Sequence, residues 1–165
     1  MDFVTTAIIA VVVPLAIGLL NKSAKRPAVT VDGRTEVAYG WGFKGFAVFS
    51  ALVAVAPLVG MFFVPPDARV PMLTIALIFG IPAAYLVLEG FFVRIRYSDE
   101  GIEARSPWRR NRFVPWRDVR RVTFSGGAQW HRIETARSGY LRVHAMKSGV
   151  DTLLRELKDR GIKNY

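Results

Sequence analysis

The sequence contains no cysteine and only two histidines, His131 and His144, in 165 residues. The missing cysteine excludes disulfides, thiolate metal sites and cysteine nucleophiles. Both histidines lie on predicted strands with polar neighbours, so we expect half-exposed residues rather than a base or metal ligands. We recognise no catalytic carboxylate pair, P-loop or activated serine. The sequence therefore predicts a protein that is not an enzyme and has no cofactor, metal site or small-molecule substrate.

Acidic residues are also scarce. There are 13 aspartates and glutamates against 23 lysines and arginines, which gives a net charge of +10. Such an excess favours a negatively charged partner, either anionic lipid headgroups or nucleic acid.

The first 93 residues carry little charge, and they contain three long apolar runs. Each run is long enough to cross a bilayer core, which takes roughly 17–25 residues. We therefore predict a membrane domain over residues 1–93, with spans at 3–20, 45–64 and 70–93. A signal peptide is the alternative for the first run, but no lysine or arginine precedes that run. The short turn at 65–69 makes the second and third spans a helical hairpin.

The loop between the first two spans predicts a small hairpin. Residues 29–31 and 36–39 flank the pair Asp32-Gly33, which favours a type I′ turn. The next aromatic residues, Tyr39, Trp41 and Phe43, are predicted to anchor the chain at the level of the lipid headgroups. A G-x-G-x-x-G pattern at residues 40–45 leads into a predicted membrane span, so we do not expect it to bind a nucleotide.

The distribution of basic residues predicts the orientation. The loop between spans one and two holds five lysines or arginines, and Arg94 and Arg96 follow the third span. Basic segments stay in the cytoplasm, so the N-terminus should lie outside and the C-terminal domain inside. We expect a multi-pass protein of the bacterial inner (cytoplasmic) membrane.

Glu89 is the only acidic residue within a predicted span. A carboxylate inside a membrane can mark a proton or ion path. Because Glu89 lies about one turn before the end of the span, we favour an interfacial position and a pair with Arg94 or Arg96.

Residues 94–165 alternate in hydrophobicity like short strands separated by turns. Residues 102–106 and 111–116 predict a hairpin, and 119–124, 129–136 and 140–145 predict three more strands. Ser148 is a predicted helix N-cap, and the helix that follows has one apolar stripe. The stripe consists of Val150, Leu153, Leu154 and Leu157.

This order of elements resembles the bacterial PH-like domains found behind transmembrane helices in small membrane proteins. The resemblance rests on Tyr97, Glu100-Gly101-Ile102, Arg105, Pro115-Trp116 and Asp118-Val119. We expect Gly101 to adopt a positive φ in a tight turn. The resemblance implies a membrane setting and a PH-like fold. Together with the three apolar runs, it predicts three transmembrane helices followed, over residues 94–165, by a β half-barrel that a C-terminal helix closes. It implies no particular biochemical activity.

Seven arginines fall within 17 residues of the predicted soluble domain. With Trp108 they form our candidate binding site for anionic lipid or a protein partner: Arg105, Arg109, Arg110, Arg112, Arg117, Arg120 and Arg121. A solvated basic surface is the alternative. Nucleic acid is less favoured, because a domain tethered to the bilayer meets lipid first.

Two functions remain open at this point. One is a non-catalytic binding or scaffold module that presents a PH-like domain at the cytoplasmic surface. The other is an accessory or assembly subunit of a larger membrane complex, with the spans as its interface.

Overall fold

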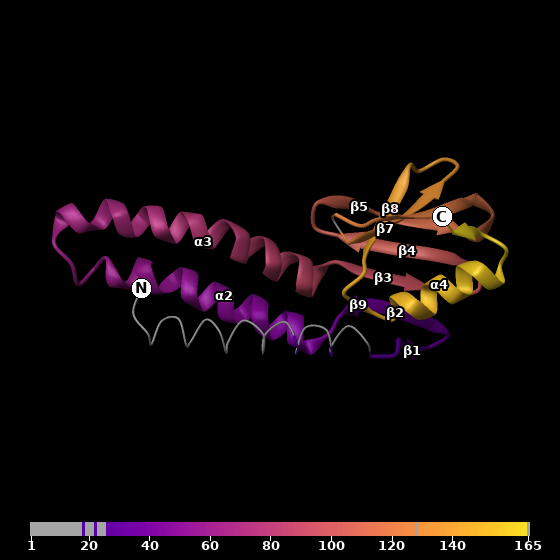
Figure 1. Cartoon of the computed structure of the whole chain (residues 1–165), viewed down its shortest axis with the longest axis horizontal. Coiled ribbons are helices and arrows are strands. Elements are labelled where there is room, and N and C mark those ends of the chain that lie inside the picture. Colours follow the sequence, from indigo (N-terminus) through magenta and orange to yellow (C-terminus); the bar gives the residue numbers. More distant parts are fainter. Residues whose placement is uncertain (1–17, 19–21, 23–25, 128, 165) are drawn as a thin grey trace.

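The computed structural model describes residue 18, residue 22 and residues 26–127 and 129–164. The predicted first span, residues 3–20, therefore lies outside the described residues except for Gly18. The described chain has a helical hairpin at one end and a β domain at the other (Figure 1).

The helical hairpin consists of α2 (Trp41–Gly60) and α3 (Pro66–Phe92). Both helices are long and apolar enough to cross a membrane, since 20 residues of α-helix span about 30 Å. They expose large apolar side chains along their length, with Leu52 65% and Ile81 70% exposed. Two candidate spans are thus present in the described part of the chain, whereas the sequence predicted three.

Each helix begins about four residues before its predicted start. Gly40 is extended, with φ −72° and ψ 173°, so α2 begins directly after it. In α3, Pro66 is the first helical residue, a position where the missing N–H of proline costs no hydrogen bond.

The first sheet has the strand order β1-β2-β3-β4-β5, and every neighbouring pair is antiparallel. Its strands are β1 (Val29–Val31), β2 (Arg34–Tyr39), β3 (Arg94–Tyr97), β4 (Gly101–Ser106) and β5 (Arg109–Pro115). The predicted hairpin before α2 is present, with Asp32 at φ 51° and Gly33 at φ 71°. Its second strand lies directly against β3. The sheet therefore includes residues that precede the helical hairpin.

The second sheet has the order β10-β6-β7-β8, and a corner of 3-10 helix (Trp116–Asp118) leads into it. Its strands are β6 (Val119–Ser125), β7 (Trp130–Thr135), β8 (Tyr140–His144) and β10 (Lys163–Asn164). A short strand, β9 (Lys147–Ser148), then returns to pair with β2. The helix α4 (Val150–Asp159) follows it directly.

The two sheets and α4 enclose one hydrophobic core. Val37 and Ile102 come from the first sheet, Ile133 from the second and Leu153 from α4, and each is at most 1% exposed. The predicted helical stripe is present, but Leu154 is only partly buried and packs at the edge of this core.

Two local predictions were wrong. Ser148 belongs to β9, and the helix N-cap is Gly149 with φ 82°. A Cβ on Gly149 would also lie 2.6 Å from the Cβ of Ala28. Gly101 is not among the described residues with positive φ. Glycine is needed there because a Cβ would lie 2.3 Å from the carbonyl oxygen of Val114 on β5.

The pairing of β2 with β3 yields a prediction about the folding unit. Val37 lies opposite Ile95, so Tyr39 and Val93 end neighbouring antiparallel strands and a two-residue Asn-Gly turn can join them. We call residues 27–39 joined in this way to residues 93–164 the joined domain. Its free energy of unfolding should exceed that of residues 94–164 alone by about 2 kcal/mol or more, because Val37 is fully buried. It should therefore unfold at a higher temperature. Thermal melts compare the two chains directly. Equal melting temperatures would show that β2 adds nothing to the domain.

Candidate functional site

A buried ion pair connects α3 to the β domain. The Nζ of Lys147 on β9 lies 3.5 Å from Oε1 of Glu89 on α3. Lys147 is 1% and Glu89 5% exposed. The same ammonium donates to the carbonyl oxygen of Val93 at 3.4 Å and lies 4.6 Å from the ring centroid of Tyr39. We call Glu89, Lys147, Val93 and Tyr39 the junction cluster.

Burial lowers the pKa of Lys147 to about 8, although the nearby carboxylate of Glu89 opposes this shift. Burial also raises the pKa of the Tyr39 hydroxyl, and the charge of Glu89 adds to that effect. A charge this well buried is costly unless it is paired. Each partner of the ion pair therefore depends on the other.

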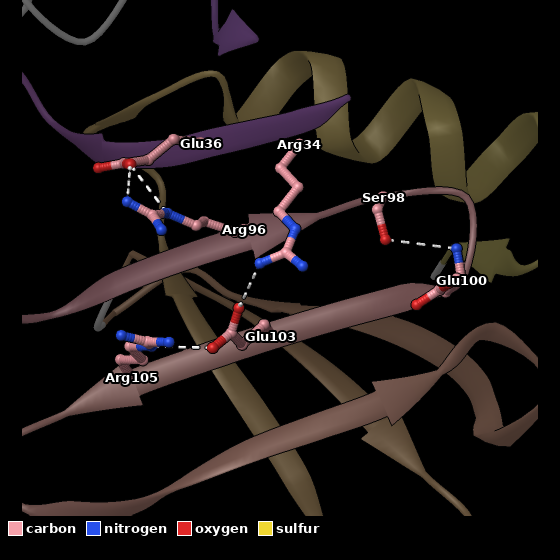
Figure 2. Close-up of polar contacts among 7 residues, drawn as sticks. All are labelled: Arg34, Glu36, Arg96, Ser98, Glu100, Glu103 and Arg105. Atoms are coloured by element: carbon pink, nitrogen blue, oxygen red, sulfur yellow. Dashed lines mark hydrogen bonds and ion pairs between the residues drawn. The ribbon is translucent and has the colours of Figure 1, made fainter. Parts of the chain in front are cut away.

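The predicted partners of Glu89 were wrong. Arg96 lies across from Glu36 on β2, and its Nη2 is 3.0 Å from the Glu36 carboxylate. Glu103 forms ion pairs with Arg105 at 2.8 Å and with Arg34 at 3.8 Å (Figure 2). These pairs lie across β2, β3 and β4, away from the junction cluster. No sequence signal singled out Lys147, because its partner is 58 positions away.

The three predicted interfacial aromatic residues lie in different surroundings. Tyr39 is buried, and its ring stacks on Phe43 with centroids 3.9 Å apart. Phe43 packs against Gly90 of α3, where an added Cβ would lie 3.1 Å from the ring. Trp41 is 74% exposed. Tyr39 and Phe43 thus hold the junction together, which leaves Trp41 as the exposed candidate for a membrane anchor.

The turn between β4 and β5 lies beside α3 at the end of the domain where that helix enters (Figure 1). Trp108 in this turn stacks on Tyr85 of α3, with centroids 5.7 Å apart and ring planes at 16°. Tyr85 precedes Phe92, the last residue of α3, by seven positions. Since a helix rises 1.5 Å per residue, Trp108 lies about 10 Å back along α3 from its end.

A pocket of about 290 Å³ lies between α3, the β4–β5 turn and β7–β8. We call it the basic pocket. Tyr85 and Glu89 form its α3 side, and Val93, Ile95 and Ala104 also line it. The hairpin contributes Arg105, Ser106, Trp108, Arg109, Arg110 and Arg112, and the second sheet contributes Trp130, Leu141 and Arg142.

The predicted arginine cluster is therefore split by the fold. Arg105, Arg109, Arg110 and Arg112 line the basic pocket. Arg117 and Arg120 instead surround a hollow beside the residues that follow α4. Arg121 forms a two-bond pair with Glu134 at 2.6 and 3.1 Å. The 3-10 corner after β5 separates these groups, because it carries the chain from one sheet to the other.

The four arginines from the β4–β5 hairpin differ in whether they have hydrogen-bond or ion-pair partners. Arg105 pairs with Glu103, and Arg112 donates to the carbonyl oxygen of Ser138 at 2.9 Å. Among the described residues, neither Arg109 nor Arg110 has a side-chain hydrogen bond or ion-pair partner, and both are exposed. These two guanidinium groups are free to bind an external anion.

The sequence did not single out Tyr85, Trp130 or Arg142, which complete the basic pocket. The sequence gives little sign of them, because the three residues come from three different elements, α3, β7 and β8. Arg142 donates to the Tyr140 hydroxyl at 2.8 Å. The pocket brings them together only through the tertiary fold.

The histidines fit the prediction of ordinary strand residues. Burial lowers the pKa of both His131 and His144. Nδ1 of His144 accepts a hydrogen bond from the Met146 N–H at 3.1 Å. Within the part of the chain that the structure describes, no group of three histidine, aspartate or glutamate side chains is placed to hold a metal.

Several of the residues that carried the family resemblance hold the β domain together. Trp116 donates through Nε1 to the carbonyl oxygen of Ser98 at 2.8 Å and meets Tyr97 edge-on. Gly101 allows the close contact of β4 with β5. Comparison with known families matches residues 93–159 to the model described as a bacterial PH domain. Residues 93–159 are thus similar to a bacterial PH domain, and we call them the PH domain.

The matched segment of the PH domain begins directly after α3 and ends with the last residue of α4. It confirms the predicted family resemblance. β1, β2 and both long helices lie outside it. No curated protein and no solved structure matches this chain.

The ion pair at the junction cluster predicts a non-additive response. In the full chain in detergent, Lys147→Met or Glu89→Gln alone should destabilise the PH domain by about 3–5 kcal/mol, because one buried charge loses its partner. The double variant should be more stable than Lys147→Met, since it leaves no unpaired charge. Tryptophan fluorescence during thermal unfolding measures all four proteins. Strictly additive losses would mean that the two groups do not interact.

Proposed function

We propose that this protein is a membrane-anchored, non-catalytic binding module whose PH domain rests against anionic lipid headgroups at the cytoplasmic surface of a bacterial inner membrane. The main support for this proposal is the stack of Trp108 on Tyr85. It places the free arginines Arg109 and Arg110 beside a helix that is apolar enough to cross a bilayer. Each basic residue near an anionic surface contributes roughly 1 kcal/mol.

The aromatic pair supports a position near the headgroups. Tyr85 is 47% and Trp108 48% exposed. Tyrosine and tryptophan are enriched at membrane interfaces, because their rings suit apolar surroundings and their polar tips suit water. The positive charge of the whole domain adds to the attraction: from Arg94 onward there are 17 lysines and arginines and 8 acidic residues.

The alternative function, a subunit of a larger membrane complex, is supported by the apolar surface of α2 and α3. Side chains such as Phe49 and Phe79 are more than half exposed along the hairpin. Lipid tails cover such a surface as well as protein does. We therefore favour the lipid-binding module, since the basic pocket has no role in the alternative.

Charge removal at the turn tests the lipid contact. Arg109→Gln with Arg110→Gln in the joined domain should weaken binding to vesicles containing acidic lipid by about 2 kcal/mol, roughly 30-fold. The matched control is Arg117→Gln with Arg120→Gln, which removes the same charge beside the C-terminal end of α4. It should have a clearly smaller effect.

Sedimentation with phosphatidylglycerol vesicles at two salt concentrations measures both pairs. The difference in vesicle binding between the wild type and the variant at Arg109 and Arg110 should become smaller at high salt, because the Debye length falls from about 10 Å at 0.1 M to 3 Å at 1 M. Equal losses for the two pairs would attribute binding to overall charge. No loss for either pair would remove the lipid contact from the proposal.

The orientation is supported by the sheet itself. Because β2 pairs with β3, the segment before α2 and the PH domain occupy the same side of any membrane that the hairpin crosses. That side carries most of the basic residues, which favours the cytoplasm. In intact cells, a cysteine replacing Asp67 in the first turn of α3 should react with an impermeant maleimide, and one replacing Lys158 should not. The reverse labelling pattern would invert the orientation.

A further inference from the structure

We propose that the basic pocket is a discrete site for the phosphate-bearing headgroup of one anionic phospholipid. This inference rests on the proposed function and makes it more specific, because a flat basic surface attracts many lipids loosely whereas a pocket holds one. The pocket joins three parts of the chain: α3, the β4–β5 hairpin, and β7 with β8.

Its size suits a glycerophosphate group. The volume is about 290 Å³, and a water molecule occupies about 30 Å³ in the liquid, so the pocket has room for roughly ten waters. A whole phospholipid does not fit. The acyl chains would leave along the apolar surface of α3, where Ile81 and Tyr85 are exposed.

Its charge suits a phosphate. Five arginines line it, and the one carboxylate among its lining residues, Glu89, is paired with Lys147. The junction cluster thus neutralises the only acid that would repel the ligand. Guanidinium groups match phosphate geometry with two parallel hydrogen bonds. Arg109 and Arg110 are exposed and lack partners among the described residues, so they are our phosphate ligands.

The rest of the lining separates a lipid from a soluble phosphate ester. Ile95 and Leu141 are buried in the domain core and form part of the pocket wall, which suits the carbon backbone of glycerol. The Tyr85–Trp108 stack forms the side nearest the membrane helices. A headgroup would therefore enter from the bilayer surface.

Cavity filling distinguishes this site from diffuse attraction. Ser106 and Ala104 line the pocket and carry no charge. Ser106→Phe, at the end of β4, should fill the space and leave every arginine in place. Ala104→Leu is a second filling variant, so the test does not depend on one of them folding. Thermal melts identify the variants that retain the fold.

The measurement uses the full chain purified in mild detergent with equal amounts of phosphatidylglycerol and phosphatidylcholine. Native mass spectrometry counts the lipids that each protein retains. The wild type should retain one phosphatidylglycerol. In a folded filling variant, the fraction of protein that retains this lipid should be at least tenfold lower. Soluble glycerol phosphate at millimolar concentration should not displace the lipid from the wild type.

Each result bears on the site. If folded filling variants retain as much phosphatidylglycerol as the wild type does, the pocket is not the lipid site. The attraction of Arg109 and Arg110 to an anionic surface is tested separately by the vesicle measurement. A wild type that retains no phosphatidylglycerol would also overturn the lipid site. Displacement by glycerol phosphate would overturn the lipid assignment in favour of a soluble phosphate ester.

Discussion

The buried pair of Glu89 and Lys147 is the interaction on which the arrangement of this protein depends. One partner belongs to a helix that is apolar enough for a membrane and the other to the PH domain. Neither charge is tolerable alone at 1–5% exposure. The pair therefore favours one docking of the domain on α3, and the stack of Tyr39 on Phe43 packs beside it.

This docking decides which face of the domain meets the helices. With Lys147 paired to Glu89, the β4–β5 turn lies next to Tyr85, which is one helical turn before Glu89 on α3. The free arginines Arg109 and Arg110 then share a pocket with Tyr85 of α3, whereas Arg117 lies beside the residues that follow α4. The function proposed for the basic pocket is thus a consequence of a packing constraint elsewhere. The pairing of β2 with β3 adds a second link between the helices and the domain.

The fold was largely predictable because its signals are local. Alternation identified β4 to β8, Asp32-Gly33 identified the first hairpin, and the stripe with Leu153 identified α4. The site was predictable only in part. Arg105 to Arg112 are close in sequence and remain together, whereas Arg117 and Arg120 leave the cluster at a corner of the chain. Arg142 and Lys147 were missed, because the other residues of the pocket around Arg142 and the Glu89 partner of Lys147 come from distant elements. No local pattern encodes such contacts.

A measurement of depth in the bilayer tests whether the β4–β5 turn lies at the membrane surface. A nitroxide on a cysteine replacing Pro107, in that turn, would be compared with one replacing Arg117, at the far end of the domain. In liposomes containing phosphatidylglycerol, paramagnetic oxygen and a water-soluble nickel reagent report the depth of each label. We expect the label at 107 at the level of the phosphates and the label at 117 in water. If both labels were fully in water, the β4–β5 turn would not lie at the membrane surface.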